Sequence, residues 1–133
     1  MRFDPLSTKS PARAPFLVAL AAAAVLAAAY IAEYGFGLRP CTLCLWQRYP
    51  YMAAVALGLL GAVLAGRPGL RRGLLALAAL AFLAAAGLAA FHVGVEQGWW
   101  PGLPGCSAPA IRQGMTVAEL RAVLEARAQV VPC

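Results

Sequence analysis

The chain has 133 residues, of which 62% are hydrophobic and 12% are charged, and its net charge at pH 7 is +6. A length of this order allows one domain at most. Because charged residues make up about 25% of an ordinary soluble domain, the composition excludes a soluble globular core and indicates a single membrane domain over residues 1–133. We find no basic stripe with interleaved aromatic residues, no glycine-rich phosphate loop and no catalytic serine arrangement, so nucleic acid is not expected as a partner.

Three apolar segments are long enough to cross a bilayer, which takes about 20 residues. We expect transmembrane helices at about 14–34, 44–65 and 73–95, with external loops at about 35–43 and 96–133. The first segment is longer than the usual core of a signal peptide, so we interpret it as a membrane helix rather than a cleaved leader. The second segment contains Pro50, where we expect a bend that neighbouring helices can tolerate.

Basic residues gather on one side of these segments. Six of the eleven lie before the first segment or in the turn between the second and third: Arg2, Lys9, Arg13, Arg67, Arg71 and Arg72. The positive-inside rule assigns this side to the cytoplasm. The N-terminus is then cytoplasmic and all four cysteines face outward, into a compartment where disulfides persist.

The first external loop ends in a CxxC motif, Cys41-Thr42-Leu43-Cys44. Such a pair forms a disulfide that is readily reduced and re-formed, and its thiolate is the nucleophile in exchange. Cys44 lies near the N-terminus of the second helix and Arg48 follows one turn later, so both positive groups are expected to lower the pKa of its thiol. A static structural clip is less favoured, because closing so short a loop adds little stability.

His92 lies near the outer end of the third segment, with Glu96 one turn later. An ionisable residue in a membrane segment is costly enough to suggest a function. At the interface, however, the same histidine has the simpler use of hydrogen-bonding water or lipid headgroups, and both interpretations stay open. Trp99 and Trp100 follow, as is typical of the place where a chain leaves lipid.

A second cysteine pair, Cys106 and Cys133, brackets the polar loop after the third segment. Taken alone the pair fits a structural staple, whose closure contributes roughly 3 kcal/mol or somewhat more. Beside a CxxC on the same membrane face, it favours a relay between thiol pairs. Within this loop Thr116 and Glu119 have capping-box spacing, which predicts a short amphipathic helix that lies on the membrane surface.

Two alternatives follow from the same cysteines. Four cysteines can bind zinc, but here a C-x2-C is followed by single cysteines after 61 and 26 residues, whereas a zinc ribbon needs two tight pairs. His92 adds no recognisable ligand pair, so we expect no metal site. The other alternative is a small noncatalytic membrane scaffold whose disulfides are purely structural.

The segment from Cys41 to Arg48, CTLCLWQR, resembles the DsbB family of bacterial disulfide-forming membrane proteins. The likeness extends over nearly the whole chain, in the order of a cytoplasmic N-terminus, the CxxC, a Gln-Arg pair, His92 at the end of the third helix, and a second cysteine pair. It implies an all-α membrane bundle of four helices, of which three are present here. We therefore expect either a fragment or a protein without the fourth helix.

The resemblance also implies an activity, that of a protein thiol:quinone oxidoreductase in the bacterial inner membrane. A DsbA-like periplasmic thioredoxin-fold protein would attack a disulfide between Cys106 and Cys133, and exchange would pass the electrons on to Cys41 and Cys44. All four cysteines are then catalytic.

The cofactor that the resemblance implies is a membrane quinone, either ubiquinone or menaquinone. Cys44 would pass the electrons to it, and the residues expected to hold it are Gln47, Arg48 and His92. The partners implied are therefore the DsbA-like protein, membrane lipid and quinone.

Overall fold

A computed structural model describes residues 10–103 and 114–129 of the chain. The elements are α1 (Arg13–Tyr30), a π-helical turn η1 (Ile31–Gly35) that continues it, α2 (Thr42–Val63), α3 (Pro68–Glu96) and α4 (Val117–Gln129). Over the described ranges the structure contains no strand. The predicted all-α class is confirmed.

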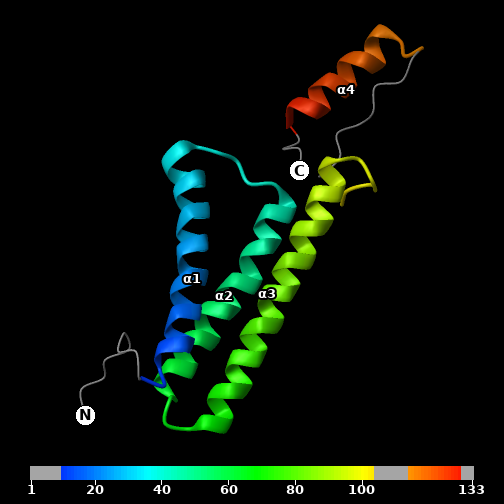
Figure 1. Cartoon of the computed structure of the whole chain (residues 1–133). Helices are drawn as coiled ribbons and strands as arrows, with labels where there is room; N and C mark the ends of the chain where they lie inside the picture. The colour runs from blue at the N-terminus through cyan, green and yellow to red at the C-terminus, as the bar shows by residue number, and fades with distance from the viewer. Residues whose placement is uncertain (1–9, 104–113, 130–133) are drawn as a thin grey trace.

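Helices α1, α2 and α3 form a bundle in which consecutive helices run antiparallel (Figure 1). α2 is the middle helix, because it packs along both neighbours whereas α1 and α3 touch each other little. The start of α1 and the α2–α3 turn lie at one end of the bundle, and the loop that leads into α2 lies at the other end beside the end of α3 (Figure 1). The topology therefore brings the CxxC motif next to the C-terminal end of α3.

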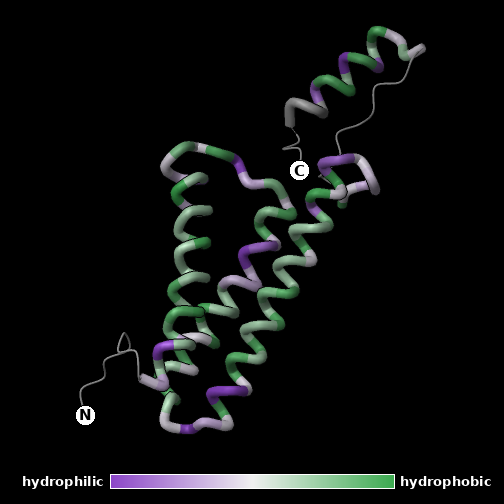
Figure 2. Tube along the Cα trace, in the orientation of Figure 1, coloured by the Kyte–Doolittle hydropathy of each residue, from purple (hydrophilic) through white to green (hydrophobic). Residues whose placement is uncertain are grey.

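Two helical segments among the described residues are long and apolar enough to cross a membrane, Arg13–Gly35 with 23 residues and Pro68–Glu96 with 29. Few of their residues are buried inside the bundle, and Figure 2 shows apolar residues along the length of both. α2 has 22 residues but does not reach the same apolar content, since its N-terminal half holds Gln47 and Arg48. The exposed apolar side chains along these helices form a surface suited to contact with lipid, as expected for an all-α membrane bundle.

Small residues bring α1 and α2 into close contact near the end that holds the α2–α3 turn. A Cβ atom at Gly58 would lie 2.7 Å from the backbone oxygen of Pro15 and 2.8 Å from the backbone nitrogen of Ala19. Pro15, Ala19 and Ala54 are buried in this contact region. Close backbone approach through small residues is how helices associate in lipid, where no hydrophobic driving force acts between them.

The predicted capping box at the start of α4 is present. The backbone nitrogen and hydroxyl of Thr116 donate to Glu119 Oε2 at 2.7 Å and 2.8 Å, and the Glu119 backbone nitrogen donates to Thr116 Oγ1 at 3.3 Å. α4 stands apart from the three-helix bundle, beyond the end of α3 (Figure 1). Its placement on a membrane surface stays a prediction.

Candidate active site around the CxxC motif

The two cysteines of the CxxC lie at the start of α2. Cys41 is the N-cap residue and Cys44 lies in the first turn, where its backbone nitrogen donates to Cys41 Sγ at 3.2 Å. Both thiols are free, and their sulfur atoms are 2.7 Å apart. Because a disulfide bond needs a separation of about 2.05 Å, small side-chain rotations suffice to oxidise the pair.

Cys41 is the more deeply placed of the two, with 4% of its surface exposed, whereas Cys44 is half-buried. Burial raises the pKa of the Cys41 thiol above its ordinary value, and the hydrogen bond with Cys44 raises it further. The backbone N–H groups of Leu43 and Cys44 act in the opposite direction. Cys41 is thus held as a neutral thiol, and the more accessible sulfur is that of Cys44.

An apolar wall from α3 and the segment after it covers Cys41. Cys41 and the buried Leu43 pack against Phe91, and the Phe91 ring stacks on Trp100 with 5.9 Å between centroids. Trp100 Nε1 donates to the backbone oxygen of Phe91 at 3.0 Å. The indole lies directly over Gly94, where any Cβ atom would overlap the ring. Gly94 is therefore the residue that lets Trp100 close this side of the site.

His92 comes from α3 and contacts the dithiol directly. Its Nε2 atom is 3.7 Å from Cys41 Sγ and 3.3 Å from Glu96 Oε1, and its Nδ1 atom is 3.2 Å from Gln47 Nε2. With the Gln47 amide nitrogen donating to Nδ1, the ring proton sits on Nε2 and points toward the carboxylate and the sulfur. The contact with Glu96 joins residues one turn apart in α3, whereas the bond to Gln47 links α3 to α2, and the sequence predicted neither contact.

Arg48 is paired with an acidic residue that sequence reasoning did not single out. Its Nη1 atom lies 2.6 Å from Glu33 Oε2, with the two side chains 11% and 21% exposed, and its guanidinium lies 4.6 Å from the centre of the Tyr30 ring. We expected Arg48 to act on the Cys44 thiol, but its ionic contact is with Glu33. The signal available in the sequence was the carboxylate itself, because an acidic residue at the end of a membrane segment is costly unless it is paired.

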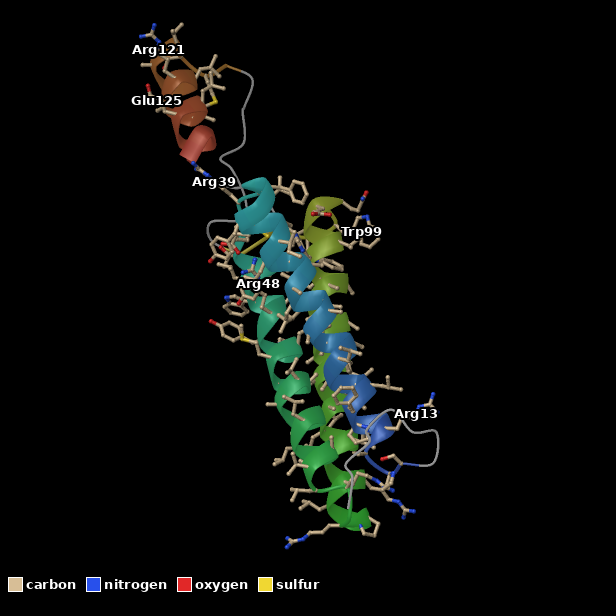
Figure 3. All side chains as sticks on the ribbon, turned by 90° about the vertical axis from the view of Figure 1, so that its left-hand side faces the viewer. Arg13, Arg39, Arg48, Trp99, Arg121 and Glu125 are labelled. Atoms are coloured by element: carbon tan, nitrogen blue, oxygen red, sulfur yellow. The ribbon has the colours of Figure 1, made fainter. Side chains whose placement is uncertain are left out.

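A cavity of about 280 Å³ opens beside Cys44, between the end of α1, the loop that follows it and the first turns of α2. Its apolar lining comes from Ala29, Ala32, Leu38 and Pro40. Its polar lining comes from Glu33, Arg39, Cys44, Gln47 and Arg48. Figure 3 shows Arg48 and Arg39 toward the end of the bundle opposite to Arg13. Cys44, and not Cys41, is the sulfur that faces this cavity.

Five of the seven predicted site residues come together at this end of the bundle: Cys41, Cys44, Gln47, Arg48 and His92. Gln47 connects the two sides, because it bonds to His92 and also lines the cavity. His92 is not among the lining residues. The remaining two, Cys106 and Cys133, lie outside the described residues, so their pairing and their role stay predictions.

The bundle places two close thiols between His92 and a cavity, and this arrangement fits a membrane protein of thiol and disulfide chemistry. Residues 11–133 match the family described as Disulfide bond formation protein DsbB. The chain belongs to the DsbB family.

Three similar proteins illustrate the relationship. Disulfide bond formation protein B 2 of Pseudomonas syringae pv. syringae is 46% identical over 54% of the chain and 43% of its own length. Disulfide bond formation protein B of Xanthomonas campestris pv. campestris is 42% identical over 63% of the chain and 50% of its own length. Uncharacterized protein RP370 of Rickettsia prowazekii is 31% identical over 72% of the chain and 55% of its own length.

The chain spans about half the length of the curated relatives it matches. No solved structure matches it significantly.

Proposed function

We propose that this chain belongs to a protein thiol:quinone oxidoreductase. It takes electrons from a reduced DsbA-like periplasmic protein and passes them through two cysteine pairs to ubiquinone or menaquinone in the membrane. The observation that supports this most directly is the pair of free thiols, 2.7 Å apart, of which Cys44 lines a cavity together with Gln47 and Arg48. Membership of the DsbB family supports the same reaction class.

The cavity suits the head of a quinone. Its volume of about 280 Å³ is near the lower end of small-molecule pockets, which begin at about 300 Å³, and its mixture of apolar lining with a few convergent polar groups is typical of them. Gln47 and Arg48 would hold the ring through its carbonyl oxygens, because both can donate hydrogen bonds. When bound there, a quinone supplies an acceptor for two electrons and two protons.

The chain's own residues manage the thiol chemistry. Oxidation of the pair breaks the two S–H bonds of Cys41 and Cys44, forms one S–S bond and releases two electrons and two protons. If the Gln47 amide turns its oxygen toward Nδ1 of His92, the ring proton moves to Nδ1 and leaves Nε2 free to take the proton of Cys41, 3.7 Å away. Glu96, 3.3 Å from Nε2, then balances the charge of the imidazolium.

The upstream steps involve the second cysteine pair. In this proposal the reduced partner attacks the Cys106–Cys133 disulfide and forms a mixed disulfide, and the thiolate set free attacks the Cys41–Cys44 disulfide in turn. Each step exchanges one S–S bond for another, so the two electrons move toward the cavity without leaving sulfur. His92 next to Cys41 can stabilise a thiolate that develops there.

The proposed orientation places the dithiol end in the periplasm, with all three bundle helices crossing the inner membrane. Two of them have the required length and apolar content, and α2 runs antiparallel between them. The opposite end holds Arg13, Arg67, Arg71 and Arg72, which supports a cytoplasmic side there because positive residues are retained inside.

Quinone reduction by the purified protein tests the proposal. Reduced DsbA-type protein and a soluble ubiquinone analogue are mixed with the protein in detergent, and the quinone absorbance is followed. We expect the absorbance to fall with the wild type and to stay constant with Cys44→Ser. Arg48→Ala should raise the KM for quinone, whereas Arg72→Ala, at the far end of the bundle, should not change it. Constant absorbance with the wild type would contradict the proposal.

A further inference from the structure

The sulfur atoms of Cys41 and Cys44 have a second potential use, as ligands of a metal ion. Three metal-ligating atoms, the Sγ atoms of Cys41 and Cys44 and a ring nitrogen of His92, lie within 4.8 Å of one another. They come from the start of α2, including its N-cap residue, and from α3, which packs beside α2. Two thiolates and one imidazole form a ligand set that zinc uses in proteins.

The distances fit a tetrahedral ion after one small adjustment. With Zn–S bonds of about 2.3 Å and Zn–N bonds of about 2.0 Å, two ligand sulfur atoms in a tetrahedral site are about 3.8 Å apart, and a sulfur and a nitrogen are about 3.5 Å apart. Cys41 Sγ and His92 Nε2 are already close to this separation, at 3.7 Å. The two sulfur atoms, 2.7 Å apart, must move apart by about 1 Å, which a rotation of the half-buried Cys44 side chain can supply.

The groups around the imidazole also suit a bound ion. A metal-bound histidine usually donates its other ring N–H to a fixed acceptor, which sets its orientation. Gln47, 3.2 Å from Nδ1, offers its amide oxygen for this purpose once the amide turns. Glu96 Oε1 lies 3.3 Å from Nε2 and its side chain is half exposed, so it can move to supply a fourth ligand, and water can take that position instead.

We propose that the reduced Cys41–Cys44 pair and His92 form a Zn²⁺ site that exists only while the pair is reduced. Binding replaces the two S–H protons by the ion, releases both protons and transfers no electrons. Oxidation to the Cys41–Cys44 disulfide removes two electrons and two ligands together, so the ion leaves. Bound Zn²⁺ would therefore withhold the dithiol from electron transfer.

This site differs from a zinc site made of the four cysteines, which was the alternative considered from the sequence. It does not need Cys106 or Cys133, and it uses His92, which is 48 residues away from Cys44 in the chain. Ligand spacing in the sequence gives no sign of it, because the contact depends on the antiparallel packing of α2 and α3. The inference does not rest on the proposed quinone reaction, since metal binding requires neither quinone nor partner.

Cobalt gives a direct test, because Co²⁺ takes zinc sites and its thiolate complexes absorb visible and near-ultraviolet light. The protein carries Cys106→Ser and Cys133→Ser, so that only two thiols remain, and is reduced under nitrogen with a phosphine. We expect one Co²⁺ per chain, with tetrahedral d–d bands and a thiolate charge-transfer band that added Zn²⁺ removes. The oxidised protein should show neither band.

Variants separate a built site from binding by a dithiol alone. His92→Ala should weaken Zn²⁺ binding by more than about tenfold, and His92→Cys should restore it with a stronger charge-transfer band. Glu125→Ala on α4 is the matched control and should leave the affinity unchanged. Circular dichroism reports whether each variant keeps its helices. Absence of cobalt bands in the reduced protein, equal binding after oxidation, or wild-type affinity in a folded His92→Ala variant would each overturn the inference.

Discussion

The two ends of the three-helix bundle are built from different kinds of contact. Near the α2–α3 turn, α1 and α2 meet through Gly58 and the backbone of Pro15 and Ala19, and the Arg71 side chain donates to the backbone oxygens of Pro11 and Ala65 at 3.4 Å. At the other end the helices are joined through polar pairs, Glu33 with Arg48 and Gln47 with His92. Close contact of backbones through small residues can therefore hold helices together in lipid, whereas pairs of polar side chains gather at the end that holds the thiols.

The polar pairs at the end that holds the thiols also reduce the free-energy cost of placing polar side chains there. A charge or hydrogen-bonding group taken out of water is costly unless it finds a partner. Arg48 has both a carboxylate and an aromatic ring beside it, and each ring nitrogen of His92 has a polar neighbour. Changes at this end should therefore alter pairing and reactivity, whereas changes at the other end should alter packing.

The largest effect on stability is expected from Gly58→Ala. The added methyl group would press on the backbone of Pro15 and Ala19, which cannot rotate away, and overpacking of this kind costs about 1 to 3 kcal/mol. The better helix propensity of alanine offsets about 1 kcal/mol of this cost. We expect the free energy of unfolding, measured in mixed detergent, to fall by about 2 kcal/mol at most.

Gly87→Ala in α3 is the matched control, because no atom beyond the glycine's own chain neighbours and helix backbone lies within 4 Å of the position that its Cβ would take. It should leave the free energy of unfolding unchanged or raise it by up to about 1 kcal/mol. Equal destabilisation by both changes would show that the close contact at Gly58 is not what holds α1 to α2.

A smaller effect is expected from Glu33→Gln at the polar end. The change removes the negative charge beside Arg48 but keeps a side chain that can accept a hydrogen bond, so the free energy of unfolding should fall by about 1 kcal/mol. Glu125→Gln on the exposed α4 is the control and should stay within about 0.5 kcal/mol of the wild type. If the two variants unfold alike, the ion pair does not stabilise the bundle.

The helices of this molecule could be predicted from its sequence more fully than the contacts that build its candidate site. The helices and the α4 capping box could be predicted because apolar runs and capping spacing involve residues that lie close together in the sequence. The pairs that build the site join residues far apart in the chain, such as Gln47 with His92, and they depend on how helices pack. The reactive residue types could thus be predicted from the sequence, but the pairing of Arg48 with Glu33 and the contact between His92 and Cys41 could not.

A pH effect should follow from the buried thiol of Cys41. Its pKa is raised above the ordinary value of 9.0 by burial, so the folded protein holds this proton more tightly than the unfolded chain. The stabilisation is fully present below about pH 9 and is lost as pH rises through the folded-state pKa. The reduced wild type should therefore lose more stability between about pH 8 and about pH 10 than Cys41→Ser does. Parallel curves for the two proteins would contradict the burial argument.

The smallest effect is expected at α4, which stands apart from the three packed helices (Figure 1). Thr116→Ala removes the hydroxyl that the Glu119 backbone nitrogen bonds to, so hydrogen exchange in the first turn of α4 should become several times faster. Thr116→Ser keeps the hydroxyl and should behave like the wild type.

The hydrogen bonds from Thr116 also lower the pKa of Glu119 below its ordinary value of 4.5. The protection from exchange that these bonds give is therefore present above pH 4.5 and is lost as pH falls through the lowered pKa. Exchange in α2 and α3 should be the same in all three proteins, because α4 stands apart from the bundle (Figure 1).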